Sequence, residues 1–272
     1  MSRTATAVTP AKAPVPAHRA TLLVGAALVT VTVAAWAAVL ARAAASSGGM
    51  AIETSTPAGL DLAGAAGFVG AWVVMMAAMM LPSAAPLVLL YRGAGADGRA
   101  LNAVSLVAAY LLVWAAFGAL VYAAQQALGA VTNASPALGN ARPYAVAGIL
   151  AIAGLYQFTF LKRACLRKCR SPLDFLMHHW RGRGPFDALR LGTEHGTYCV
   201  GCCWGLMAVL VISGAMSLLW VVLIALIVFM EKVMPFGERS AQLSGAGLGL
   251  LAVLVAIHPP LSMLLRGGGA GM

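Results

Sequence analysis

The sequence predicts an all-α protein: a polytopic bundle of transmembrane helices with about seven spans, or six, and a cytoplasmic N-terminus. Hydrophobic residues make up 61% of the chain and charged residues 10%, whereas about 25% of the residues of a soluble domain are charged. The apolar residues gather in runs of about 20, the length that a helix needs to cross a bilayer. These runs do not alternate with polar residues, so helices are favoured over barrel strands.

The predicted spans form a single domain that covers residues 20–266. Residues 1–19 carry few large apolar side chains and are predicted to be a disordered tail. The apolar run from Cys199 to Met230 is too long for one span, and Ser213-Gly214 offers a turn that divides it into a helical hairpin. The predicted spans are 20–42, 65–91, 101–124, 143–163, 197–213, 216–236 and 245–265.

The basic residues predict the orientation. With the N-terminus inside, all of the 18 Lys and Arg lie on the cytoplasmic side except Arg42, Arg142 and Arg266, as the positive-inside rule requires. Because the net charge of +10 is explained by these loops, no nucleic-acid partner is predicted. The abundant Ala and the excess of Arg over Lys fit a GC-rich bacterial genome, so the predicted location is the bacterial inner membrane.

A basic segment between the fourth and fifth spans, residues 162–195, stands out among the connections. Apolar side chains such as Phe175 and Trp180 recur in it among Arg and His. This pattern predicts a cytoplasmic amphipathic segment that lies at the bilayer surface. Its basic side chains would contact anionic lipid headgroups.

All five cysteines lie between residues 165 and 203. Three of them are spaced i, i+3, i+4, which places them on one face of a helix, and a histidine one turn earlier extends that face. The other two, four residues apart, end the fourth predicted span at the same membrane depth. A thiol also serves as a small apolar packing group, but five thiols beside a histidine favour a soft-metal site. The candidate ligands in this region are Cys199, Cys202, Cys203, His195, Cys165 and Cys169.

Thioethers line the second predicted span. Met75 and Met79, and likewise Met76 and Met80, form i, i+4 pairs just before Pro82. Methionine is either a flexible apolar filler or a ligand that favours copper, and both interpretations stay open. Met79 and Met80, in the cytoplasmic half of the span, are the candidate ligands.

Polar side chains inside spans need partners in lipid. Glu231, at the inner end of the sixth span, is predicted to complete or gate the metal site; alternatively, it pairs with Lys232 or with a loop arginine. Tyr156 and Gln157 lie about two turns before Cys165 and, with Lys232, are predicted to hold the metal ligands in position.

Four pieces of the chain resemble one known family. They are Trp72 through Pro82; Tyr156-Gln157 with Lys162, Cys165, Cys169-Arg170 and Pro172; His195-Gly196 followed by Tyr198-Cys199 and Gly201-Cys202-Cys203-Trp204; and Glu231-Lys232. Together they cover roughly residues 65–250. The sequence resembles a bacterial family of predicted metal-binding integral membrane proteins, domain of unknown function 2182. The resemblance implies a metal site and supplies no reaction.

The sequence therefore predicts a membrane protein that binds a soft metal near the cytoplasmic face, with copper favoured over zinc or iron. Its role would be metal handling or transfer, with a metal chaperone or a membrane protein as partner. Two alternatives stay open: a membrane-embedded enzyme that uses a metal or a thiol pair for redox chemistry on a lipophilic substrate, and a structural subunit of a membrane complex. The sequence alone does not decide whether the protein is an enzyme.

Overall fold

The computed structural model describes residues 16–46, 62–93, 100–135, 141–181, 184–213 and 217–265, and every regular element in these ranges is a helix. The predicted all-α class is confirmed. The helices are α1 (Pro16–Ser46), α2 (Leu62–Gly93), α3 (Ala100–Ala134), α5 (Arg142–Tyr156), α6 (Phe160–Arg170), α7 (Pro172–His179), α8 (Pro185–Ile212), α9 (Leu218–Val233), α10 (Gly237–Ile257) and α11 (Leu261–Leu265).

Within the described ranges, five helices are long and apolar enough to cross a membrane: α1, α2, α3, α8 and α10. The consecutive helices α5 and α6 meet at a bend of 63° and would together provide a sixth span. Helix α9 has 16 residues and is about 24 Å long, less than the roughly 30 Å of a hydrocarbon core. The count of seven spans and the cytoplasmic N-terminus stay predictions.

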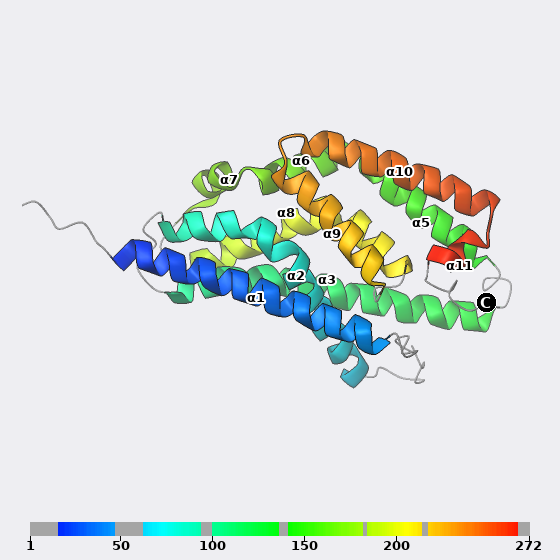
Figure 1. The fold of residues 1–272 in the computed structure, drawn as a ribbon, viewed down its shortest axis with the longest axis horizontal. Helices are drawn as coiled ribbons and strands as arrows, with labels where there is room; N and C mark the ends of the chain where they lie inside the picture. The colour runs from blue at the N-terminus through cyan, green and yellow to red at the C-terminus, as the bar shows by residue number, and fades with distance from the viewer. Residues whose placement is uncertain are drawn as a thin grey trace, which may run out of the picture.

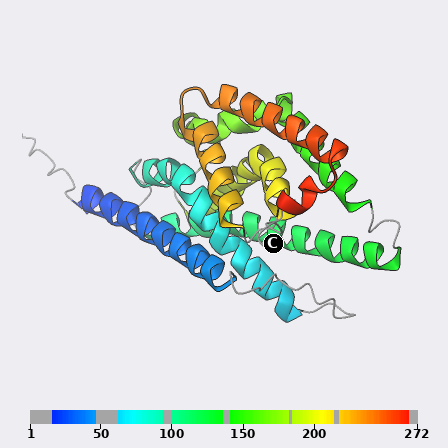
Figure 2. The ribbon, with the colours of Figure 1, turned by 45° about the vertical axis from the view of Figure 1, so that its right-hand side comes forward.

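The helices form a bundle in which α8 lies among the other helices and α9 covers part of it (Figure 1). Helix α1 packs along α2 at one edge of the bundle, and α5 packs along α10 at the other (Figure 2). Helix α8 contacts α3, α5, α6 and α9. It is therefore the element around which the others are arranged.

Glycine allows the close approach between α5 and α10. A Cβ atom added to Gly154 would lie 2.9 Å from the carbonyl oxygen of Gly245 and 3.0 Å from the backbone nitrogen of Gly249. Small residues at such positions let two helix backbones approach closely enough for dense packing inside a membrane. The pairing fixes α5, and with it the bend at Tyr156 and Gln157 that leads into α6.

The long apolar run is divided between α8, which ends at Ile212, and α9, which begins at Leu218. Helix α8 starts at Pro185, about three turns before the predicted beginning of the span at residue 197. The additional turns carry Asp187, Arg190 and Glu194, and their polarity led the sequence interpretation to start the span later.

Residues 162–195 are not one surface segment. They are divided among α6, α7 and the first turns of α8. Phe175 and Leu176 are buried in a cluster with Leu87 and Tyr91 of α2, so much of the apolar side of α7 packs against protein instead of lipid. Most of the predicted tail, residues 1–15, lies outside the described residues, and residues 16–19 belong to α1.

Candidate functional site

Helix α8 presents one buried face that carries four predicted ligands. His195, Cys199, Cys202 and Cys203 are all buried, with at most 3% of each residue exposed. The helical spacing places them on successive turns of the same side. The α3, α5, α6 and α9 helices that contact α8 shield this face from solvent.

Three thiols from two helices lie together; Cys169, Cys202 and Cys203 are called the thiol group below. The Cys169 sulfur of α6 is 3.8 Å from the Cys202 sulfur of α8, and the Cys202 and Cys203 sulfurs are 3.3 Å apart. All five cysteines are free thiols. Cys165, one turn before Cys169, faces Gly201, where an added Cβ would lie 2.9 Å from the Cys165 sulfur.

Cys199 lies beside the thiol group and also contacts side chains of two further helices. Its sulfur lies 3.0 Å from the hydroxyl oxygen of Tyr110 on α3 and accepts a hydrogen bond of 2.9 Å from the Lys232 ammonium of α9. The same ammonium is 3.5 Å from the thioether sulfur of Met80 on α2. Lys232 therefore connects a thiol and a thioether from different helices, an arrangement called the Lys232 bridge below.

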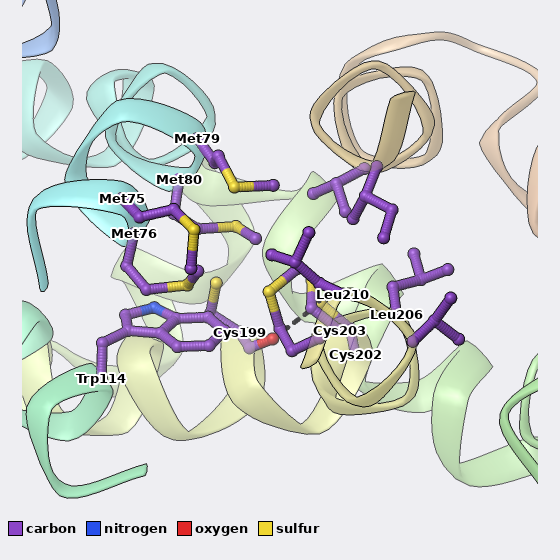
Figure 3. Packing of buried hydrophobic residues seen from close by; sticks show 14 of the residues in the cluster. Met75, Met76, Met79, Met80, Trp114, Cys199, Cys202, Cys203, Leu206 and Leu210 are labelled. Atoms are coloured by element: carbon purple, nitrogen blue, oxygen red, sulfur yellow. Dashed lines mark hydrogen bonds between the residues drawn. The ribbon is translucent and has the colours of Figure 1, made fainter. Parts of the chain in front are cut away.

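The methionines of α2 face the cysteines of α8. Figure 3 shows the side chains of Met75, Met76, Met79 and Met80 reaching from α2 towards the labelled cysteines. All four methionines are buried and belong to the same apolar cluster as the five cysteines. Helix α2 continues through Pro82, and the Ser83 hydroxyl donates to the Met80 carbonyl oxygen at 2.8 Å. The helix thus brings thioethers to the thiols without ending at the proline.

Glu231 pairs with Lys162, not with Lys232 or with one of the loop arginines that the sequence offered as alternatives. The Lys162 ammonium is 2.6 Å from Glu231 Oε2, and both side chains are 1% exposed. Glu231 Oε1 accepts hydrogen bonds from Ser244 at 3.1 Å and from Gln157 at 3.4 Å. Both carboxylate oxygens are thus engaged by protein groups.

The Glu231–Lys162 pair is linked to the backbone that carries the thiols. The Lys162 ammonium also donates to the Cys202 carbonyl oxygen at 2.5 Å. In the same region, the Tyr156 hydroxyl donates to the Gly201 carbonyl oxygen at 2.5 Å. The bond from the Lys162 ammonium is charge-assisted and therefore stronger than the neutral bond from Tyr156. Glu231, Lys162 and Tyr156 thereby fix the position of α8 at the level of Cys202.

His195 lies in an aromatic setting. Its ring centroid is 5.8 Å from that of Tyr110 and 5.2 Å from that of Phe175. Its Nδ1 atom is buried and has no hydrogen-bond partner among the described residues. Buried polar atoms are seldom left unpartnered, so His195 Nδ1 is a candidate ligand atom in the tautomer that carries its proton on Nε2.

The predicted ligands do not form one compact site. Among the described residues, no three His, Cys, Asp or Glu side chains are arranged to hold one metal ion. The thiol group includes two sulfurs on adjacent residues, and Cys202 Sγ also donates to the Cys199 carbonyl oxygen at 3.1 Å. Thiol and thioether donors together suit Cu(I). A copper site here could therefore include the thioether of Met80 in addition to Cys and His side chains.

Two contributors to the site were not predicted from the sequence. Tyr110 was hidden among the apolar residues of its span, although a phenol inside a membrane needs a partner. Lys162 was assigned to the basic cytoplasmic segment, yet it is 1% exposed. The signal for Lys162 was present, because a carboxylate in a span needs a cation and Lys162 precedes Cys165 by only three residues.

Comparison with protein families gives a match over residues 69–255 to the PpoB2 family, described as a copper chaperone. Comparisons with curated proteins and with solved structures give no match. The matched range begins in α2 and ends in α10, so it contains the methionines, the thiol group, the Lys232 bridge and the Lys162–Glu231 pair. The chain belongs to the PpoB2 family of copper chaperones.

Proposed function

We propose that this chain is a multi-pass protein of the bacterial inner membrane that takes up Cu(I) as cargo at the buried face of α8 and passes it to an acceptor. The observation that carries the proposal is the meeting of thiols from α6 and α8 with the thioethers of α2. Soft sulfur ligands select Cu(I) over hard cations, and the family handles copper.

The donors suit transfer better than permanent storage. Cys169, Cys202 and Cys203, together with the neighbouring Cys199 and Met80, supply more soft atoms than one Cu(I) requires. Neighbouring sets of donors allow an ion to move by exchange of one ligand at a time. Met79 and Cys165 lie beside these sets as additional donors, and His195 offers its unpartnered nitrogen one turn from Cys199.

The surface of the bundle supports the membrane location. Large apolar side chains such as Leu23 on α1, Leu112 on α3 and Leu250 on α10 are more than half exposed. A soluble protein would rarely leave so much apolar surface uncovered. The exposed Lys and Arg of α6 would meet anionic lipids at the cytoplasmic side. A soluble copper chaperone or a membrane protein would be the exchange partner. The redox-enzyme and structural-subunit alternatives gain no support from the family.

The test is the copper content of protein purified without oxygen after loading with Cu(I). The wild-type chain is expected to retain copper in stoichiometric amount, and the Cys199→Ser and Cys202→Ser variants to lose most of it. Val209→Ala is the matched control, because Val209 is buried on the same helix and carries no donor atom. Loaded wild-type protein should also give up its copper to a strong Cu(I) chelator.

Wild-type protein that retains no copper would contradict the proposal. Equal retention by the wild type and by both serine variants would contradict the assignment of the site to α8.

A further inference from the structure

We infer that the Lys232 ammonium occupies the place of a Cu(I) ion between Met80 and Cys199, so that the protein's own cation must be displaced when the metal binds. The inference rests on the proposed function and adds a means of release to it. A built-in competitor keeps the affinity for copper low enough for transfer.

The geometry of the Lys232 bridge leads to this inference. The ammonium nitrogen lies 2.9 Å from the Cys199 sulfur and 3.5 Å from the Met80 sulfur. These sulfurs come from α8 and α2, and the lysine comes from a third helix, α9. Both are donors of the kind that Cu(I) prefers, and a single cationic atom now contacts both.

Lys232 is an unusual buried lysine because no carboxylate among the described residues pairs with it. Lys232 is 7% exposed, and a buried charge normally has a partner of opposite charge. The adjacent Glu231 is already paired with Lys162. Within the described ranges, no Asp or Glu oxygen lies within ion-pair distance of Lys232. In the described part of the chain, the hydrogen-bond partners of this ammonium are therefore the two soft sulfurs.

Exchange between the two cations conserves charge at this position. When the Cys199 sulfur is a thiolate, the lysine ammonium and Cu(I) each place one positive charge against it, so replacing one by the other leaves the local charge balance unchanged and releases no proton. Both cannot stay between the same two sulfurs, because like charges repel strongly at short range in a weakly polarisable interior. The flexible four-carbon stem of lysine allows the ammonium to withdraw when the metal enters and to return when it leaves.

A second interpretation predicts the opposite effect. Lys232 would then assist copper binding by stabilising negative charge on the Cys199 sulfur, and its removal would weaken the affinity. The two interpretations therefore differ in the sign of one measured quantity, the dissociation constant for Cu(I).

The experiment compares Lys232→Gln and Lys232→Leu with the wild-type chain in detergent, titrated with Cu(I) against a chromophoric Cu(I) chelator without oxygen. Neither substitution adds a soft donor, as Met would. We expect both variants to bind Cu(I) about tenfold more tightly, within the range by which groups around a metal site tune affinity, and to release it to excess chelator more slowly. Lys232→Arg, which keeps the charge, should bind close to the wild-type level.

Lys168→Gln is the matched control, because Lys168 is 36% exposed on α6. Unchanged or weaker binding by both charge-removing variants would overturn the inference while leaving the proposed function intact. A wild-type chain that binds no Cu(I) would contradict the proposed function, and the inference would fall with it, because a lysine that prevents binding altogether would not serve transfer.

Discussion

Replacing Glu231 by Gln should destabilise the fold by about 3–5 kcal/mol, the loss typical of a buried ion pair that loses one partner. A loss of this size is expected because Lys162 Nζ and Glu231 Oε2 are 2.6 Å apart and both side chains are 1% exposed. Glutamine keeps the shape of the side chain and an oxygen that can accept from Ser244 and Gln157. The loss of stability therefore measures the cost of leaving the Lys162 ammonium buried without its charge partner.

The double variant Lys162→Leu with Glu231→Gln should recover most of this loss, because no unpaired charge stays behind. It still lacks the hydrogen bond from Lys162 to the Cys202 carbonyl, so its stability should stay about 1 kcal/mol below that of the wild type. The free energy of unfolding is measured in detergent by denaturant titration, with tryptophan fluorescence as the probe.

Glu238→Gln is the matched control, because Glu238 is exposed in the first turn of α10. Its stability should stay within about 0.5 kcal/mol of the wild type. A Glu231→Gln variant as stable as the wild type would refute the reasoning. Copper retention by the stable double variant would exclude the Glu231 carboxylate, which the sequence had suggested, as a metal ligand.

Three further substitutions test the packing and the site. Gly154→Ala should destabilise the bundle by about 1–3 kcal/mol, because its Cβ would lie 2.9 Å from the Gly245 carbonyl oxygen. Gly148→Ala is the control, because a Cβ there meets no atom within 4 Å. Equal unfolding free energies of the two variants would contradict the close approach. Tyr110→Phe should lower the unfolding free energy by about 0.5–1.5 kcal/mol through loss of the contact with the Cys199 sulfur, and no change would mean that the contact contributes nothing to stability. Met80→Leu should weaken Cu(I) binding in the chelator titration, whereas the exposed Met177→Leu should not; equal affinities would exclude the Met80 thioether as a ligand.

The periodicity of the sequence predicted which residues share a face, and for α8 this was sufficient. His195, Cys199, Cys202 and Cys203 lie on one helix and are all buried, because a helical spacing determines relative direction without knowledge of the neighbouring helices. The same reasoning grouped the methionines of α2. However, the spacing of residues along one helix gives no distance between helices. The 3.8 Å contact between Cys169 and Cys202 could therefore be found only from the structure.

Charge patterns were less informative, because the linear sequence does not distinguish an exposed interfacial lysine from a buried one near the end of a span. Lys162 follows the bend between α5 and α6, and this bend turns it inward to Glu231. Phe175 was expected at the lipid surface for the same reason, yet α7 folds back against α2. Both errors come from connections whose direction depends on tertiary packing.

The pairing of Lys162 with Glu231 determines what the second buried lysine can do. Glu231 and Lys232 are neighbours in sequence, and side chains at i and i+1 of a helix point in different directions. One faces Lys162, Gln157 and Ser244, and the other faces the sulfurs of Cys199 and Met80. A single turn of α9 thus carries the anion that anchors α8 and the cation that contacts the soft donors. Movement of α9 relative to α8 would therefore alter both contacts together. In the proposed function, release of copper would then be coupled to the Glu231–Lys162 pair through the position of Lys232.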